Sequence, residues 1–217
     1  NFPFVTKKKT LGPPPRARPP PGGGGACFNA RGNEMLTGEI QFALKDGRTA
    51  VLRSPREEEA EEILKFFQLA ASETDFLLVT GEEAAQITPE QEKSFIKNIV
   101  ASPNTAMFIC FVGGEIAGNC QITFKTNAKE RHRAEFAIAL VSKFWNLGIG
   151  TKMFSELTSV AKSRDGVTMA ELEFLEGNTR ARALYEKSGF RITSVFPDKY
   201  KSKDGRLLNA YLMTKKL

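Results

Sequence analysis

Two short segments in the C-terminal half of the chain combine residue types that can bind a charged group and move protons. The first is Phe144–Thr151, in which Gly148 and Gly150 precede a stretch with helical apolar spacing. A glycine bend before a helix exposes main-chain N–H groups, which carry partial positive charge and bind phosphate. Neither a P-loop nor a dinucleotide-binding fingerprint is present, because no Gly-Lys-Ser/Thr and no third glycine follow at the required spacing. The segment therefore predicts either a phosphate cradle of backbone amides or a plain glycine turn.

The second segment runs from Leu172 to Phe190 and predicts a strand, a turn and a helix. Helical spacing places Asn178, Ala181 and Tyr185 on one face of that helix. Asparagine offers an amide, alanine leaves room for a ligand, and the tyrosine hydroxyl can donate or accept a proton. The alternative is an N-capped helix whose tyrosine only packs against the core.

Three glutamates on strand-like segments are candidates for a general base. Glu173 lies on the strand directly before the Asn178 helix and is the first choice. Glu171 points to the same strand face and could replace Glu173 or share its role through water. Glu135, on the preceding strand, is the third candidate. A solvated strand face is the alternative interpretation, because charges at alternate strand positions usually face water.

The elements that must position these residues alternate between strand-like and helix-like patterns. Helices are expected to begin at Pro55, at Thr88-Pro89 with Gln91 as capping partner, at Gly148 or Ile149, and at Asn178. Residues 71–87 look irregular, and Gly113-Gly114 predicts a hairpin. Strands are expected at 49–53, 106–112, 115–125, 133–141, 169–175, 190–196 and 207–214. This order predicts an α/β (α+β) fold with a mixed central sheet of about seven strands flanked by four helices.

Composition narrows the function classes. Six of the 31 Lys and Arg residues lie in residues 1–33, which hold no acid, so the rest of the chain balances 25 bases with 25 acids. We therefore divide the chain into a disordered Pro/Gly-rich basic extension over 1–34 and one domain over 35–217, and we expect no nucleic-acid partner. The sequence contains no run of about 18 apolar residues, so it predicts no membrane-spanning helix. With one histidine and three scattered cysteines, the sequence predicts no metal site. The three cysteines also predict no disulfide framework, which favours a cytoplasmic location.

Together the two segments resemble the signature motifs of the GNAT superfamily of N-acetyltransferases. In that family a Q/R-x-x-G-x-G/A motif cradles the pyrophosphate of acetyl-CoA. Gly148 and Gly150 occupy its small positions, and Trp145 stands where Gln or Arg is usual. The family's N-x-x-A-x-x-L-Y-x-x-x-G-F pattern matches residues 178–190 without gaps. The motifs are most similar to those of bacterial ribosomal-protein-alanine acetyltransferases, whose base occurs in a similar Leu-Glu-Val-x-x-x-Asn context.

The resemblance implies a GNAT fold and an acetyl-CoA-dependent transfer of an acetyl group to a primary amine by direct attack. Glu173 would be the base and Tyr185 the acid. Acetyl-CoA would be a co-substrate held largely by main-chain groups, with no metal. Leu140 and Val141 would pair with its pantetheine arm, and Asn178 and Ala181 would contact the arm near the thiol. The pyrophosphate would bind main-chain N–H groups of six consecutive residues, Leu147, Gly148, Ile149, Gly150, Thr151 and Lys152. The Lys152 side chain would add positive charge there. The alternative is a catalytically silent acyl-CoA-binding or sensing module of the same fold.

The amine acceptor is the part that the motifs do not specify. In this fold the region between the first strand and the hairpin, here about 55–105, and the last hairpin would form the acceptor side. Within the first region, residues 74–77 are candidates for lining it. The motifs are compatible with an amine acceptor that is either a small molecule or a peptide. No membrane partner is expected. The motifs leave undecided whether the protein forms a homodimer.

Overall fold

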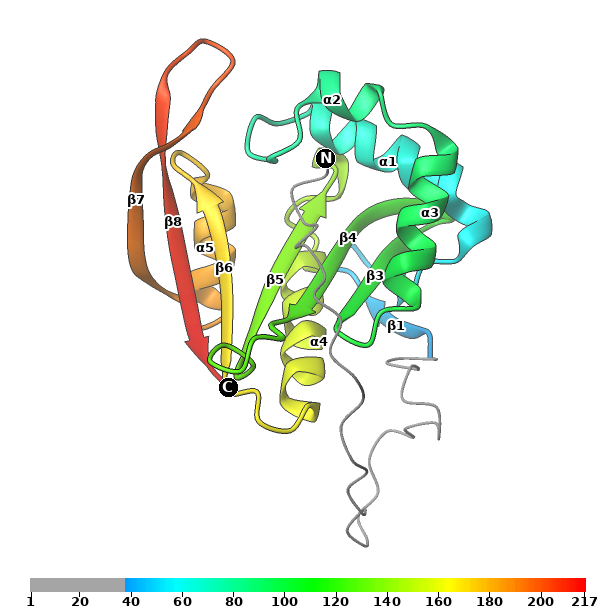
Figure 1. Ribbon diagram of the computed structural model, residues 1–217. Coiled ribbons are helices and arrows are strands. Elements are labelled where there is room, and N and C mark those ends of the chain that lie inside the picture. The colour runs from blue at the N-terminus through cyan, green and yellow to red at the C-terminus, as the bar shows by residue number, and fades with distance from the viewer. Residues whose placement is uncertain (1–37) are drawn as a thin grey trace, which may run out of the picture.

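A computed structural model describes residues 38–217, so the extension predicted over 1–34 lies outside the described residues. Figure 1 shows a twisted sheet that carries α1, α2 and α3 on one face and α4 and α5 on the other. The strand order is β1-β2-β3-β4-β5-β6-β8-β7, and only β5 and β6 run parallel. The predicted mixed sheet with helices on both faces is confirmed.

Eight strands and five α-helices lie within residues 38–217. The strands are β1 (Ile40–Ala43), β2 (Thr49–Arg53), β3 (Thr105–Val112), β4 (Glu115–Phe124), β5 (Arg133–Leu140), β6 (Met169–Leu175), β7 (Arg191–Lys201) and β8 (Leu207–Lys216). The helices are α1 (Ala60–Ser72), α2 (Gly81–Ala85), α3 (Pro89–Val100), α4 (Ile149–Ser163) and α5 (Thr179–Lys187). No helix in this part of the chain is both long and apolar enough to cross a membrane.

Local capping signals account for where several helices begin. Thr88 accepts a hydrogen bond from the Gln91 N–H, and the Gln91 side chain accepts from the Thr88 N–H, as the capping pattern predicted. Thr80 and Glu83 form the same capping box ahead of α2. The sequence prediction of an irregular segment over 71–87 was wrong there, because a five-residue helix is too short to show apolar periodicity. Strand β1 was missed as well.

The core between α4 and the sheet is built from aromatic and aliphatic side chains. Phe154 on α4 contacts Phe136 of β5 and Phe190, with ring centroids 5.9 and 5.7 Å apart. Phe154, Phe190 and the neighbouring Met153 and Leu157 are almost fully buried. This packing anchors the first turns of α4 close to the end of β5, where the glycine bend lies.

Strands β5 and β6 separate after a short paired stretch. They pair only at Arg133–Met169, Ala134–Ala170 and Glu135–Glu171, and Figure 1 shows them diverging beyond that point. Ala117 has no partner on β3, so β4 carries a bulge there, and bulges bend and twist a strand. The Val141 N–H, just after β5, donates to the Ala117 carbonyl at 3.2 Å. β5 therefore follows the bent β4, whereas β6 stays paired with β8.

Candidate active site

The bend before α4 presents an uninterrupted run of free main-chain donors. Gly148 is the N-cap of α4 with a φ of 97°, and Asn146 also has a positive φ of 65°. From Asn146 to Thr151, no N–H group donates to a described residue of the protein. The Lys152 N–H, in contrast, donates to the Gly148 carbonyl at 3.1 Å. The free donors thus include the predicted residues 147–151 but not the Lys152 amide, because the fourth residue of a helix already bonds to the N-cap.

Gly150 packs closely against side chains of α5 and β5. A Cβ atom there would lie 2.9 Å from Leu184 Cδ2 on α5 and 3.5 Å from Leu140 Cδ1. At Gly148 an added Cβ atom would meet no described atom within 4 Å, but the positive φ disfavours any residue with a side chain. One glycine therefore allows the helices to approach each other, and the other allows the bend.

Side chains around the bend differ from what the motif alone suggested. The Lys152 ammonium pairs with Glu156 at 2.7 Å. Trp145 donates from its indole N–H to the Leu140 carbonyl at 2.9 Å, so it ties the bend to the end of β5. The Arg180 guanidinium of α5 lies 4.3 Å above the Trp145 ring and donates to Asn146 Oδ1 at 2.9 Å. Positive charge at the bend is thus contributed by Arg180, which sequence reasoning missed.

The residues predicted to contact the pantetheine arm lie at the mouth of the separated strands. Val141 has no free N–H group, because its N–H bonds to Ala117, and its carbonyl already accepts one bond, from the Phe144 N–H at 3.1 Å. The Leu140 carbonyl accepts from Trp145 and can accept one more bond. Asn178 caps α5 through its side-chain oxygen, which accepts from the Ala181 N–H at 3.1 Å. Its amide NH2 donates to no described residue, so it is available to a ligand.

Tyr185 lies with its ring in the core and its hydroxyl in contact with solvent. The side chain is 7% exposed, and its ring centroid is 5.2 Å from Phe154 and 5.8 Å from Phe174. The hydroxyl has no hydrogen-bond partner among residues 38–217, and no fully buried polar side-chain atom in that range lacks one, so the hydroxyl keeps access to solvent. Burial raises the pKa of Tyr185 to about 12, which keeps the hydroxyl protonated at neutral pH.

The structure separates the three candidate bases. Glu135 and Glu171 face each other at the last β5–β6 pair, where Lys125 lies 2.5 Å from a Glu135 oxygen and 3.4 Å from a Glu171 oxygen. Arg133 also bonds to Glu171, which is 9% exposed. These ion pairs stabilise the closed end of the strand pair. Glu173 lies beyond the last pair, where the strands have parted.

Both carboxylate oxygens of Glu173 are bonded to β7. The Lys199 ammonium lies 2.5 Å from Oε2, and the Tyr200 hydroxyl donates to Oε1 at 2.7 Å. Burial and the bond with Glu173 raise the pKa of Tyr200. β7 loses its register with β8 between Phe196 and Tyr200, and this irregular stretch turns Lys199 and Tyr200 toward β6. Sequence reasoning missed both residues, because no local pattern marks a change of register.

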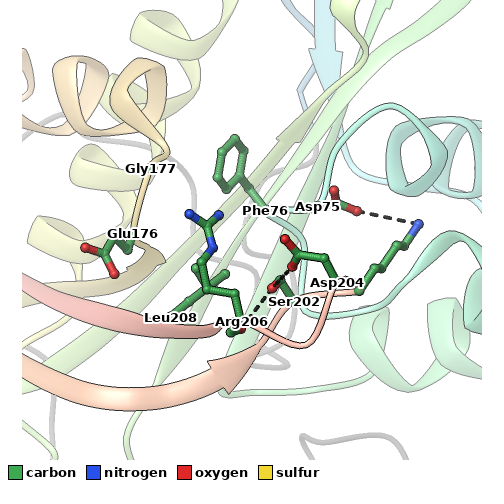
Figure 2. A pocket seen from close by; sticks show the side chains of 9 residues that line it. Asp75, Phe76, Glu176, Gly177, Ser202, Asp204, Arg206 and Leu208 are labelled. Carbon is green, nitrogen blue, oxygen red and sulfur yellow. Dashed lines mark hydrogen bonds and ion pairs between the residues drawn. The ribbon is translucent and has the colours of Figure 1, made fainter.

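A cavity of about 380 Å³ lies beyond the C-terminal end of β6 (Figure 2). Three separate segments form it: the loop after α1, the turn after β6 and the β7–β8 hairpin. Its lining residues are Asp75, Phe76, Glu176, Gly177, Ser202, Lys203, Asp204, Arg206 and Leu208. The loop after α1 and the last hairpin are the regions from which an acceptor side was predicted. Glu173 and its partners Lys199 and Tyr200 are not among the lining residues.

Comparisons with known proteins show what the chain is similar to. A sequence profile of the Acetyltransferase (GNAT) family matches residues 65–190. L-amino acid N-acetyltransferase AaaT of Escherichia coli (strain K12) is 22% identical over 130 residues, which are 60% of this chain and 80% of that protein.

Two solved structures have similar folds. An acetyltransferase of the GNAT family from Streptococcus pneumoniae superposes with a TM-score of 0.72 and 26% identity, over 77% of this chain and 99% of that one. The structure of yncA from Salmonella typhimurium, which holds its cofactor acetyl-CoA, gives a TM-score of 0.66 and 16% identity over 77% of this chain and 94% of that one. Because the family profile spans more than half of the 217 residues, the chain belongs to the Acetyltransferase (GNAT) family and is an N-acetyltransferase.

Proposed function

We propose that the protein moves the acetyl group of acetyl-CoA to a primary amine by direct attack, with Glu173 as the base and Tyr185 as the acid. One observation supports this assignment above the others. The two side chains lie on opposite faces of β6, beyond the last residue that pairs with β5. Phe174 contacts Tyr185, and the adjacent Glu173 points to the other face, because successive strand residues alternate. An amine and a thiol leaving group would each meet a proton-handling residue.

The residues of the bend fit the diphosphate of acetyl-CoA. The free N–H groups from Asn146 to Thr151 stand at the N-terminus of a 15-residue helix, where the helix dipole favours an anion. Arg180 adds a full positive charge beside them. The Asn178 side-chain oxygen caps α5, and its free amide NH2 would bond to the pantetheine arm. Acetyl-CoA would supply the reactive thioester.

The proton transfers follow from the chemistry of the two groups. An ammonium has no lone pair, so Glu173 first accepts a proton from the acceptor nitrogen, directly or through water, and passes it to solvent. As the N–C bond forms and the C–S bond breaks, the Tyr185 hydroxyl protonates the leaving sulfur. The nitrogen loses its second proton, which restores the Tyr185 hydroxyl through solvent. The products are an N-acetylated acceptor and the CoA thiol.

Contacts of Glu173 in the free protein indicate how an acceptor would bind. The Lys199 ammonium lies against Oε2 in the free protein. An acceptor ammonium would take this place when the exposed Lys199 side chain moves into solvent. Tyr200 would keep its bond to Oε1 and hold the carboxylate toward the opening.

Substitution of Glu173 by Gln tests the assignment of the base. Glu171→Gln and Glu135→Gln are matched controls, since each removes one carboxylate from the same strand pair. We expect Glu173→Gln to lower kcat by about 10²-fold or more, in the range of general base catalysis, with the CoA dissociation constant unchanged. The assay measures thiol released from acetyl-CoA over a panel of amines.

The outcomes separate the two functions. A wild-type rate in Glu173→Gln would remove the assignment of the base. CoA binding with no turnover on any amine would instead support the silent acyl-CoA-binding module. Thermal stabilisation of the wild-type protein by CoA is the accompanying measurement of binding.

A further inference from the structure

The loop after α1, residues 73–80, connects the ends of the two strands that part. Glu73 accepts two hydrogen bonds from Ser142, one from the main-chain N–H at 2.6 Å and one from the hydroxyl at 2.9 Å. Ser142 lies two residues after the end of β5. At Gly177, two residues after the end of β6, an added Cβ atom would lie 3.5 Å from Phe76 Cε1. The loop therefore contacts the chain on both sides of the opening, and Figure 1 shows it beside the ends of β5 and β6.

The two ends of this loop lie close together. An added Cβ atom at Gly81, the first residue of α2, would lie 3.5 Å from the Cα atom of Ser72, the last residue of α1. Within the loop, the Phe76 N–H donates to the Thr74 hydroxyl at 3.2 Å. Surface loops with adjoining ends are compact units that often carry binding residues. The position of such a unit relative to the sheet depends on its contacts with other elements.

The polar contacts that attach the loop to other elements differ in strength. Both oxygens of the Glu73 carboxylate are bonded, and hydrogen bonds to an ionised acceptor are about twice as strong as neutral ones. Their donor is held in place, because the Ser142 carbonyl accepts from the Trp145 N–H at 3.0 Å. Asp75 reaches Lys203 of the β7–β8 hairpin at 3.5 Å, but both side chains are half or more exposed, and exposed ion pairs contribute little. Glu73 is therefore the polar group that fixes the loop against β5.

The loop also forms part of the cavity wall. Asp75 and Phe76 line the cavity together with the turn after β6 and the β7–β8 hairpin, as Figure 2 shows. The Phe76 side chain is 38% exposed, so it presents apolar surface to a ligand. Asp75 and Phe76 follow Glu73 by two and three residues, so a loop released from Ser142 would move this part of the wall.

We infer that Glu73 is a positioning residue for the amine acceptor, because its bonds to Ser142 hold the loop side of the cavity wall at a fixed place beside β5. This inference rests on the proposed acetyl transfer to an amine. The bend that would hold acetyl-CoA has an anchor of its own, since the Trp145 indole donates to the Leu140 carbonyl at 2.9 Å. A wall that contacts the acceptor equally before and during attack contributes uniform binding, whose loss raises KM and leaves kcat unchanged. Glu73 should therefore act on the acceptor and leave CoA binding intact.

Steady-state kinetics of Glu73→Ala test the inference. The acceptor is whichever of benzylamine, spermidine, L-methionine and a short peptide with a free N-terminal alanine gives the highest kcat/KM in the wild-type protein. We expect the acceptor KM to rise about 10-fold or more, the size expected for the loss of charge-assisted hydrogen bonds. The kcat and the CoA dissociation constant should both stay within about twofold of the wild type. Glu73→Gln keeps one acceptor oxygen and should give a smaller rise in KM.

Variants of the partner and of a nearby acid provide the controls. Ser142→Ala removes the hydroxyl bond but keeps the main-chain N–H bond, so its rise in KM should be smaller than that of Glu73→Ala. Because both substitutions act on one contact, the double variant should have the KM of Glu73→Ala. Glu61→Ala removes an exposed acid of α1 and should keep the wild-type KM. An acceptor KM in Glu73→Ala within about twofold of the wild type would overturn the inference, as would a lower kcat with an unchanged KM.

Hydrogen exchange measures the contact without turnover. Deuterium uptake is compared between the wild-type protein and Glu73→Ala in peptides that cover residues 73–80 and 141–145. We expect faster uptake in both segments of the variant and unchanged uptake in α3, because only the loop and its partner lose a contact. This result would support the anchoring role of Glu73 even where no amine is acetylated, so a failure of the proposed function is recognised separately. Equal uptake in the two proteins would overturn the inference.

Discussion

Replacement of Tyr185 by Phe removes one hydroxyl group from the candidate site and leaves the ring in place. The ring contacts with Phe154 and Phe174 persist, because phenylalanine has the same ring. The hydroxyl makes no hydrogen bond to residues 38–217, so the free energy of unfolding should change by less than about 1 kcal/mol. The free donors of the α4 bend are untouched, and the CoA dissociation constant should stay within about twofold. The variant therefore isolates proton transfer to the leaving sulfur.

The expected loss of rate follows from the leaving group. General acid catalysis contributes about 10²–10⁴-fold. A thiol has an ordinary pKa of about 8.5, so a thiolate leaves more readily than an alkoxide, and we expect the lower end, about 10²-fold in kcat or about 2.7 kcal/mol in the barrier. Because burial raises the pKa of Tyr185 to about 12, the acid stays protonated, and wild-type kcat should show no loss from this group between pH 8 and 10.

The assay is release of CoA thiol, followed with a chromogenic disulfide and corrected by a blank without amine. Cys110 and Cys120 are buried and burial raises both thiol pKa values, so these residues should react slowly with the reagent. Tyr211→Phe is the control, because Tyr211 stacks on the same Phe174 ring at 5.2 Å but lies on β8. A kcat within twofold of the wild type in Tyr185→Phe would refute the assignment of Tyr185 as the acid. A wild-type kcat that falls as the pH rises toward 10 would also refute it.

Three further substitutions have expected outcomes. Gly150→Leu should weaken CoA binding at least 10-fold by calorimetry, because the side chain would push α4 away from Leu184; wild-type affinity would contradict this. Gly118→Ala should cost about 1–3 kcal/mol in urea unfolding, since its Cβ would lie 2.3 Å from Leu140 Cδ2. Burial raises the pKa of Glu92 from 4.5 to about 7, so the folded state binds the proton more tightly and loses stability as pH rises through that range. Glu92→Gln should therefore raise the free energy of unfolding by about 1–3 kcal/mol at pH 8 and change it little at pH 4.5. An equal increase at both pH values would contradict the raised pKa of Glu92.

Several features of the fold were readable from local sequence because short-range hydrogen bonds create them. The capping box of Thr88 and Gln91 spans three residues and marked the start of α3. Asn178 was expected at the start of α5 and caps it through a bond to the Ala181 N–H. Gly113-Gly114 marked the β3–β4 hairpin. In each case the interacting atoms are neighbours in the chain, so residue type and spacing suffice.

The same locality explains why the two motifs were recognised while their partners were not. The glycine bend and the α5 pattern are continuous in sequence. Arg180 meets Asn146 across 34 positions, and Lys199 meets Glu173 across 26. No periodicity reports such contacts, because they depend on how helices pack and where a strand loses register.

The sequence by itself determined the order of most elements, the two family motifs and a short set of candidate acids. Only the tertiary structure distinguishes the surroundings of those acids. Glu171 and Glu173 are two residues apart and share a strand face, so no sequence pattern distinguishes them. The point at which β5 and β6 part lies between them. Glu171 is paired with Arg133 and Lys125 at the closed end, whereas Glu173 lies beyond the last pair and bonds to Lys199 and Tyr200 of β7. That point depends on the bulge in β4 and on the pairing of β6 with β8, which are long-range properties of the folded sheet.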